Sequence, residues 1–223
     1  MIVPIAGVLS PAQLAEIHAR LDEGRFVDGR ETAGWHARLV KDNQQAARGE
    51  SVQRAGDIVR TALEASEVFK AAVRPQRLRA PLFSRYSDGQ SYGAHVDDAL
   101  MRAGEATIRT DVSVTVFLND PESYAGGELV IESTGGEQSF KLEAGAVLAY
   151  PSTTLHYVAP ITQGRREVAV TWAQSQVRSA EQREILFDLD TARRGLFQRE
   201  GKTREFDLLS KSQANLLRLW AEP

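Results

Sequence analysis

A histidine and a carboxylate, His95 and Asp97, stand two positions apart near the middle of the chain. On an extended strand, residues i and i+2 point to the same face, so one short piece of backbone could offer both side chains to a metal. A second histidine, His156, lies far downstream. Two histidines and one carboxylate form the facial triad of non-heme Fe(II) oxygenases, which leaves coordination positions open. We therefore predict an iron centre made by His95, Asp97 and His156.

Arg166 follows His156 by ten residues and starts a segment of alternating character. Val168, Val170 and Trp172 share its face if the segment is a strand. A guanidinium on an otherwise apolar, inward face is costly unless it meets an anion, and its planar fork suits a carboxylate. We predict that Arg166 binds the far carboxylate of a dicarboxylate whose keto-acid end chelates iron.

Composition restricts the possible ligands and partners. The 223 residues include no cysteine, so disulfides, thiolate metal sites and cysteine nucleophiles are excluded. A net charge of -3 gives no sign of a general affinity for nucleic acid. The chain shows neither a signal-peptide pattern nor an apolar run near the roughly 20 residues that span a bilayer. We expect no nucleic-acid or membrane partner, and a soluble cytoplasmic protein.

Residues 1–77 read as a helical and strand support region. Residues 2–9 suggest a short strand, and Ser10 with the proline and glutamine after it forms a helix-capping pattern. Residues 51–73 carry apolar side chains at helical spacing and predict a second helix. Between these helices we predict strand and loop, with Trp35 buried.

Residues 78–178 have the two-residue period of strands. In residues 112–118, valines and a leucine alternate with other side chains, which predicts a strand with one apolar face. Short strands separated by glycine-containing turns indicate an antiparallel jelly roll, also called a double-stranded β-helix. We therefore predict a mainly β fold whose jelly-roll core is buttressed by N-terminal and C-terminal helices.

Residues 179–223 return to the helical period. Apolar residues predict helices over 180–189 and 206–220, joined by a polar link at 193–195. The apolar face of the last helix could serve an interface, so a homo-oligomer is possible.

Other polar residues near these elements have less definite roles. His18 is expected at the surface or core edge, His36 is expected to be structural, and Asp98 should point away from Asp97 on a regular strand. Four polar residues follow Lys41, and they could form either a solvated loop or a wall of the substrate pocket: Asp42, Asn43, Gln44 and Gln45.

The chain resembles the PKHD-type hydroxylases, bacterial Fe(II)/2-oxoglutarate-dependent dioxygenases related to prolyl 4-hydroxylases, some of which are called iron-uptake factors. The resemblance runs nearly end to end, and its motifs lie at residues 7–11, 42–45, 81–86, 92–97, 109–111, 124–129, 150–156 and 172–175. It implies that His95, Asp97 and His156 bind Fe(II), that Arg166 binds 2-oxoglutarate, and that Tyr86 helps to hold this co-substrate.

The resemblance implies an O2-dependent hydroxylation that releases succinate and CO2, with ascorbate as a supporting reductant. The primary substrate stays open between a peptidyl residue, a free amino acid and a siderophore-like small molecule. Two alternatives belong to other classes. One is a non-catalytic iron and 2-oxoglutarate sensor or iron-homeostasis accessory protein. The other is a metal hydrolase, which would need a general base near the metal that the sequence does not offer.

Overall fold

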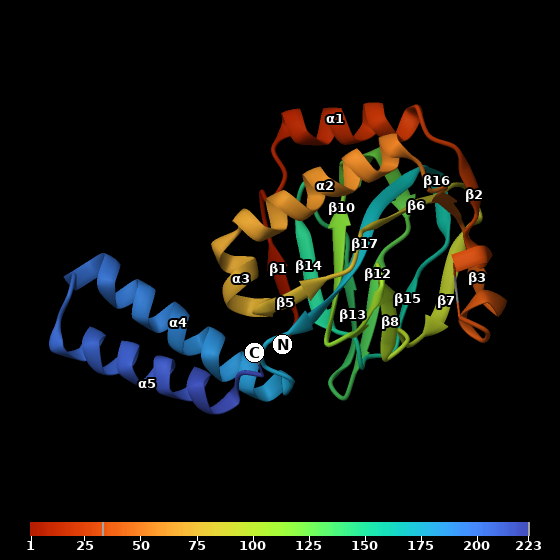
Figure 1. Ribbon diagram of the computed structural model, residues 1–223. Helices are drawn as coiled ribbons and strands as arrows, with labels where there is room; N and C mark the ends of the chain where they lie inside the picture. The colour runs from red at the N-terminus through yellow and green to blue at the C-terminus, as the bar shows by residue number, and fades with distance from the viewer. Residues whose placement is uncertain (33, 223) are drawn as a thin grey trace.

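Eight strands form the larger of two facing β-sheets. The computed structural model describes residues 1–32 and 34–222 (Figure 1). The strands of this sheet pair antiparallel. β5 (Pro75–Leu78) pairs with the last part of β17 (Arg166–Ser175), beyond the part of β17 that pairs with β6 (Leu82–Tyr86). The order across the sheet is β1 (Val3–Ile5), β14 (Val147–Pro151), β10 (Val112–Phe117), β17 (Arg166–Ser175), β6 (Leu82–Tyr86), β4 (Gln44–Ala46) and β2 (Phe26–Asp28).

The smaller sheet covers the inner face of the larger one. Its order is β13 (Gly136–Phe140), β12 (Leu129–Ser133), β15 (His156–Val158), β7 (Ser91–His95) and β3 (Lys41–Asp42). Side chains from both sheets pack together in one apolar cluster that includes Phe117, Ile131 and Val168. Two further strand pairs flank the sheets: β8 (Leu100–Ala103) with β9 (Ala106–Arg109), and β11 (Tyr124–Gly126) with β16 (Ile161–Gly164). The predicted jelly-roll core is therefore confirmed.

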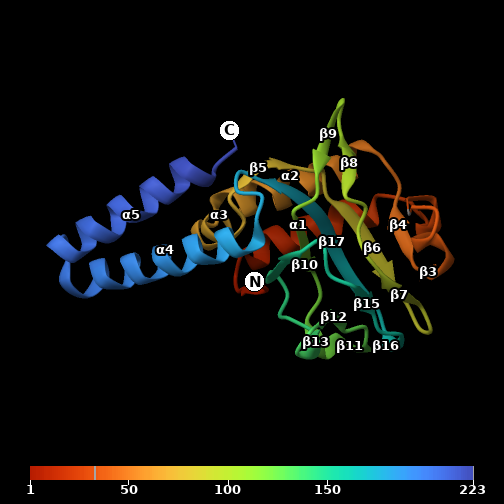
Figure 2. The ribbon, with the colours of Figure 1, turned by 90° about the horizontal axis from the view of Figure 1, so that it is seen from below.

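Three helices cover the outer face of the larger sheet, as Figures 1 and 2 show. They are α1 (Pro11–Asp22), α2 (Glu50–Ala65) and α3 (Glu67–Val73). Buried apolar residues of all three helices, such as Ile17, Leu63 and Phe69, join those of β10 and β17 in the main core. The capping box at Ser10 is present, as the sequence predicted. These helices bury the outside of the sheet, so polar groups can face the inside.

Strand β10 carries the predicted valine face toward these helices. Val112, Val114 and Val116 lie in the main core. The opposite face is buried as well, because the smaller sheet covers it, and Ser113 and Thr115 there line a cavity between the sheets. An alternating strand between two layers thus places its polar residues inside the jelly roll.

The C-terminal helices project away from the β core as a hairpin (Figures 1 and 2). Helix α4 (Ala180–Glu200) runs straight through the predicted link at 193–195, and the turn to α5 (Arg204–Trp220) comes at Gly201 instead. The predicted link was wrong because its polar residues are neutralised on the helix surface. Arg193 and Arg194 pair with Asp190, which lies one turn earlier.

Two predictions in the first 77 residues were also wrong. Trp35 is 78% exposed, because it lies among turns at the edge of the smaller sheet and not in the core. The predicted helix over 51–73 is broken at Ser66, whose side chain accepts a hydrogen bond from the Phe69 backbone and so starts α3. The short 3-10 turns are Gly29–Thr32, Ala37–Leu39 and Pro121–Ser123.

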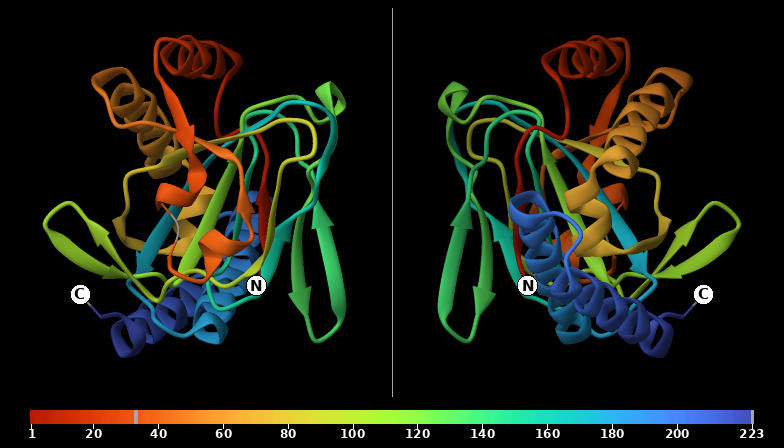
Figure 3. Two further views of the ribbon diagram at one scale, coloured as in Figure 1. Left: turned by 90° about the vertical axis from the view of Figure 1, so that its right-hand side faces the viewer. Right: turned by 90° about the vertical axis from the view of Figure 1, so that its left-hand side faces the viewer.

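The strand hairpins stand out from the body of the molecule in the side views. Figure 3 shows the β12–β13 hairpin in green and the β8–β9 hairpin in lime on opposite sides of the core. Among the described residues, no helix combines the length and apolar character needed to cross a membrane.

Candidate functional site

The three predicted metal ligands meet inside the jelly roll. His95 is the last residue of β7 and pairs directly with His156, the first residue of β15. Asp97 lies two positions beyond the end of β7, where the chain turns back toward the larger sheet. One ligating atom from each residue lies within 4.8 Å of the others. The structure therefore brings together side chains that the sequence separates by sixty residues.

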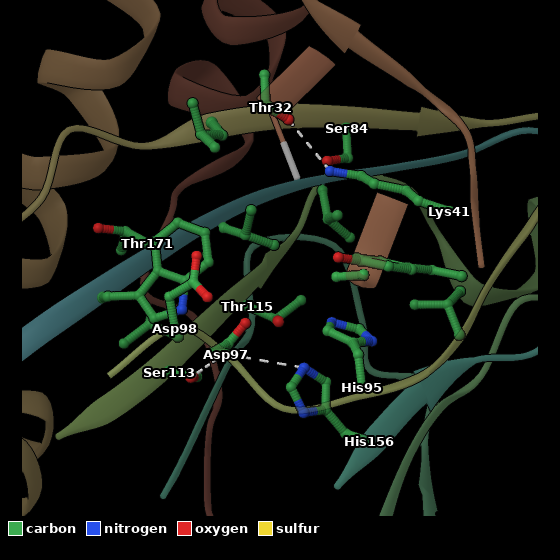
Figure 4. A pocket seen from close by; sticks show the side chains of 18 of the residues that line it. Thr32, Lys41, Ser84, His95, Asp97, Asp98, Ser113, Thr115, His156 and Thr171 are labelled. Carbon is green, nitrogen blue, oxygen red and sulfur yellow. Dashed lines mark hydrogen bonds and ion pairs between the residues drawn. The ribbon is translucent and has the colours of Figure 1, made fainter. Parts of the chain in front are cut away.

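Both imidazoles are oriented by backbone carbonyls. The Nδ1 atom of His95 donates to the Gly93 carbonyl at 2.8 Å, and that of His156 donates to the Thr154 carbonyl at 3.1 Å. Each Nε2 atom is then left as the acceptor, and that of His156 lies 3.9 Å from an oxygen of Asp97 (Figure 4). A hydrogen bond at the other ring nitrogen is the usual way in which a protein fixes a metal-binding histidine.

Burial keeps His95 in its neutral form. Desolvation and the neighbouring His156 lower the pKa of His95 to about 4. The Tyr92 ring stacks on the imidazole with ring centroids 3.7 Å apart. A neutral imidazole held in one orientation is the form that binds metal.

Two serines support the carboxylate, a role that no pattern in the sequence indicated. Ser113 of β10 donates a hydrogen bond to Asp97, and the Ser113 and Ser152 hydroxyls lie 2.8 Å apart. The alternation of β10 was the available signal, because it placed Ser113 on the face opposite the valines. Its partner depends on the turn after β7, which periodicity does not describe.

Arg166 is buried, and no carboxylate among the described residues forms an ion pair with it, although the Tyr124 side chain is hydrogen-bonded to it. Its side chain is 1% exposed, and its guanidinium lies 5.2 Å from the Tyr86 ring centre and 5.7 Å from that of Phe117. Within the described part of the chain, its Nε atom has no hydrogen-bond partner. Since a buried guanidinium needs an anion, the surroundings of Arg166 fit a carboxylate.

A cavity of about 300 Å³ connects Arg166 with the triad. Of the four residues whose role was left open, Gln45 lines it, whereas Asp42, Asn43 and Gln44 are not among its lining residues; the preceding Lys41 also lines it. Asp42 ends β3, and Gln44 and Gln45 belong to β4, so only Asn43 between them is outside a strand. Asp98 also lines the cavity, although it is exposed and lies outside the triad.

The remaining two histidines lie outside the triad. His18 is half-buried on α1, with Nδ1 3.2 Å from Glu167 and Nε2 2.9 Å from the Leu118 carbonyl. Its predicted place at the core edge is confirmed. His36 contacts the Trp35 ring edge-on, and its structural role stays a prediction.

The donor set fits the groups that the sequence suggested. Two imidazoles and one carboxylate whose ligating atoms converge match the facial triad of Fe(II) enzymes. The buried Arg166, whose Nε has no partner among the described residues, fits the distal carboxylate of 2-oxoglutarate in the same cavity.

Comparison with known proteins gives the same class. Residues 81–174 match the family model of the 2OG-Fe(II) oxygenase superfamily, and residues 181–222 match that of the PKHD-type hydroxylase C-terminal domain. A PKHD-type hydroxylase of Synechococcus elongatus is 54% identical over 223 residues, which is all of both chains.

Solved structures share the fold at low sequence identity. A Trichoplax adhaerens prolyl hydroxylase, in complex with a hypoxia inducible factor peptide fragment, aligns with a TM-score of 0.57 and 16% identity, over 83% of this chain and 86% of that one. HygX from Streptomyces hygroscopicus, with nickel, 2-oxoglutarate and hygromycin B bound, aligns with a TM-score of 0.51 and 14% identity, over 78% and 82%. By its full-length identity to curated relatives, this chain belongs to the PKHD-type hydroxylases, which are enzymes of the 2OG-Fe(II) oxygenase superfamily.

Proposed function

We propose that this enzyme hydroxylates its primary substrate at an Fe(II) ion held by His95, Asp97 and His156. Arg166 binds the distal carboxylate of 2-oxoglutarate, and Tyr86 helps to hold the co-substrate. The observation that carries this proposal is one cavity containing both three convergent ligating atoms and a buried arginine whose Nε has no partner among the described residues.

The bound iron and 2-oxoglutarate supply the oxidative chemistry, in which O2 is consumed, succinate and CO2 are released, and a substrate C–H becomes C–OH. The protein residues position these groups. Gly93 and Thr154 orient the imidazoles, Ser113 orients Asp97, and the apolar walls limit the access of water. The Arg166 fork binds the co-substrate bidentately, so its reacting end can point to the metal.

The primary substrate is a peptidyl residue, an amino acid or a siderophore-like small molecule. Among the structural neighbours, one was solved with a peptide fragment and another with hygromycin B, so this fold accepts both kinds of ligand. The relatives are named hydroxylases, which favours turnover over a sensor or an iron-homeostasis accessory function.

Several associated properties are further parts of the proposal. We further propose that ascorbate supports turnover, that the enzyme is linked to iron uptake and that it works in the cytoplasm. The apolar face of the last helix offers a surface for a homo-oligomer. We also keep the division into a support region (1–77), a jelly-roll core (78–178) and a C-terminal helical segment (179–223).

The test combines metal binding with turnover. The wild type should bind one Fe(II) per chain and release succinate from 2-oxoglutarate. His95→Ala and Asp97→Ala should each lose stoichiometric metal and lower succinate release at least 100-fold, because a ligand is missing. His36→Ala, which changes a histidine outside the cavity, is the matched control and should keep both properties. Full metal binding by either ligand variant would contradict the assignment.

A further inference from the structure

Lys41 is a buried cation in the cavity wall that the proposed chemistry does not use. Its side chain is 6% exposed and comes from β3, at the position paired with Tyr92 of β7. The Nζ atom donates to the Thr32 hydroxyl at 3.2 Å. Among residues 1–32 and 34–222, no carboxylate forms an ion pair with it within 4 Å. An ammonium has three donors, and burying one without a counter-charge is unfavourable.

The polar wall around Lys41 is already assembled. The Thr32 hydroxyl is hydrogen-bonded to Oε1 of Gln45, and Nε2 of Gln45 donates to the Ser84 hydroxyl at 3.2 Å. Gln45 and Ser84 are both buried. Figure 4 shows the ammonium beside Thr32 and Ser84, across the cavity from Asp97 and His156. The network therefore fixes the cation in place and leaves donors free for a ligand.

The charges around the cavity point to an anion. Arg79 and Arg102 line it in addition to Lys41 and Arg166, and Nη1 of Arg79 is buried with no partner in the described residues. The lining carboxylates are Asp97, which is assigned to the metal, and Asp98, which is exposed. With Arg166 assigned to 2-oxoglutarate, positive charge is left over for the primary substrate.

Lys41 lies near the proposed metal site, because it and His95 contact the same aromatic ring. The Tyr92 ring stacks on His95, and Nζ of Lys41 lies 5.0 Å from the centre of the same ring. Only the Tyr92 ring would thus separate an anion bound to Lys41 from the proposed metal ligand His95. Apolar side chains that line the same cavity suit the uncharged part of a substrate: Leu82, Met101, Val170 and Trp172.

We infer that Lys41 binds an anionic group, a carboxylate or a phosphate, on the primary substrate. This inference rests on the proposed function, because it names the class of molecule that the same site hydroxylates. Burial lowers the pKa of Lys41 to about 8, so a bound anion would favour the ammonium over the free amine.

The test measures protection of Lys41 from a neutral acetylating ester, with mass spectrometry of the peptides. The protein is loaded with Zn(II) and 2-oxoglutarate, and the probes are acetate, benzoate, phosphate and uncharged benzamide. Lys202, 70% exposed, is the internal reference. At least one anion should slow acetylation of Lys41 several-fold relative to Lys202, and benzamide should not. Comparing phosphate with the two carboxylates distinguishes the two kinds of anion.

Three outcomes would overturn the inference. They are no protection by any anion, equal protection by benzamide and benzoate, or full protection by 2-oxoglutarate alone, which would assign Lys41 to the co-substrate. Calorimetry of Zn(II) and 2-oxoglutarate binding on the same sample tests the proposed function separately. Labelling of Lys41 is also measured in the metal-free protein, so this result does not depend on metal binding.

Variants separate recognition from folding. Lys41→Met should weaken binding of the protecting anion by roughly 10- to 100-fold, the range for a charge-assisted hydrogen bond. Its 2-oxoglutarate affinity should stay within about twofold, and Lys41→Arg should restore most of the anion affinity. Lys70→Met removes an exposed lysine outside the cavity and should change neither affinity. Equal anion binding by wild type and Lys41→Met would also overturn the inference.

Discussion

At the scale of single residues, the site depends on side chains that orient other side chains. Asp97 lies beyond the regular part of β7, so its position is not fixed by strand geometry alone. The Ser113 hydroxyl, supported by Ser152, holds the carboxylate from the opposite sheet. Outer hydrogen bonds of this kind commonly affect metal affinity by 10- to 100-fold.

Ser113→Ala should therefore weaken Fe(II) binding by roughly 10-fold or more, while the fold is kept. Metal titration monitored by calorimetry would measure this change. Ser84→Ala, a buried serine on the same cavity but away from Asp97, is the matched control. Unchanged metal affinity in Ser113→Ala would mean that Asp97 needs no support from β10.

Arg166→Met should mainly raise the 2-oxoglutarate requirement, by on the order of 10- to 100-fold, because a bidentate charged contact is lost. Metal binding should be little changed, since Arg166 is outside the triad. The measurement is the dependence of succinate release on 2-oxoglutarate concentration. Arg165→Met, half-exposed and adjacent in sequence, should leave that dependence unaltered.

At the scale of elements, β17 carries a different charge on each face. Arg166 points into the cavity, whereas Glu167 on the outer face contacts Arg85 at 2.6 Å and His18 at 3.2 Å. Burial alone would raise the pKa of Glu167, but hydrogen bonds from His18 and Arg85 lower it to about 2. The strand that carries Arg166 is thus tied to α1 and β6 by an ion cluster.

This cluster predicts a pH-dependent stability. The hydrogen bond to Glu167 raises the pKa of His18, although burial opposes the shift. The resulting stabilisation is complete below the unfolded value of about 6.5 and is lost as pH rises through the higher folded value. We expect about 1 kcal/mol, a modest figure because His18 is partly exposed to solvent.

In denaturant unfolding from pH 6 to 9, the free energy of unfolding should fall more in the wild type than in His18→Gln. The contribution of Lys41, whose pKa is about 8, is common to both proteins. His95 affects the free energy of unfolding only at lower pH, since its pKa is lowered to about 4. His36→Gln, outside the cluster, should behave as the wild type does. The same slope in His18→Gln as in the wild type would contradict the role of His18.

The sequence predicted the elements that have a strong local signal. The capping box at Ser10, the alternation of β10 and the inward face of Arg166 depend on neighbours in the chain, and all three agree with the structure. The link at 193–195 failed because ion pairs with Asp190 make two arginines compatible with a helix. Trp35 failed because hydrophobicity alone does not decide burial.

The residue types of the candidate site could be predicted from the sequence, but the contacts between these residues could not. The triad and Arg166 were identified from spacing and resemblance, whereas Ser113, Thr32 and the cavity position of Lys41 depend on pairing between distant strands. Pairing of β3 with β7 decides whether residues 41–45 form a loop or a wall. No local sequence pattern indicates which distant strands pair with each other.

At the scale of the whole molecule, the C-terminal hairpin is attached to the core at its base. Arg183 near the start of α4 is buried and donates to the Val177 and Arg178 carbonyls. The chain end returns to the same place, where Glu222 pairs with Arg109 at 3.0 Å and Ala221 bridges Val177. The outer part of the hairpin projects away from the β-sheets (Figure 1), and no residue of α4 or α5 is among the residues that line the cavity.

Deletion of residues 203–223 should therefore leave Zn(II)-supported binding of 2-oxoglutarate within about twofold of the wild type. The melting temperature should fall by roughly 2–4 °C for each kcal/mol of packing lost between α4 and α5. Calorimetry and thermal unfolding measure the two effects. Loss of co-substrate binding without unfolding would show that the hairpin acts on the cavity.

The direct pairing of His95 with His156 has a consequence for the lifetime of the protein. The two strands meet only in the folded chain, so a metal ion bridging them binds the native state in preference to the unfolded ensemble. At a free metal concentration one hundred times the dissociation constant, this preference adds about 2.7 kcal/mol to the free energy of unfolding. Copies synthesised during iron scarcity would then open more often and be degraded sooner than loaded ones, which makes the abundance of this enzyme itself respond to the supply of its metal.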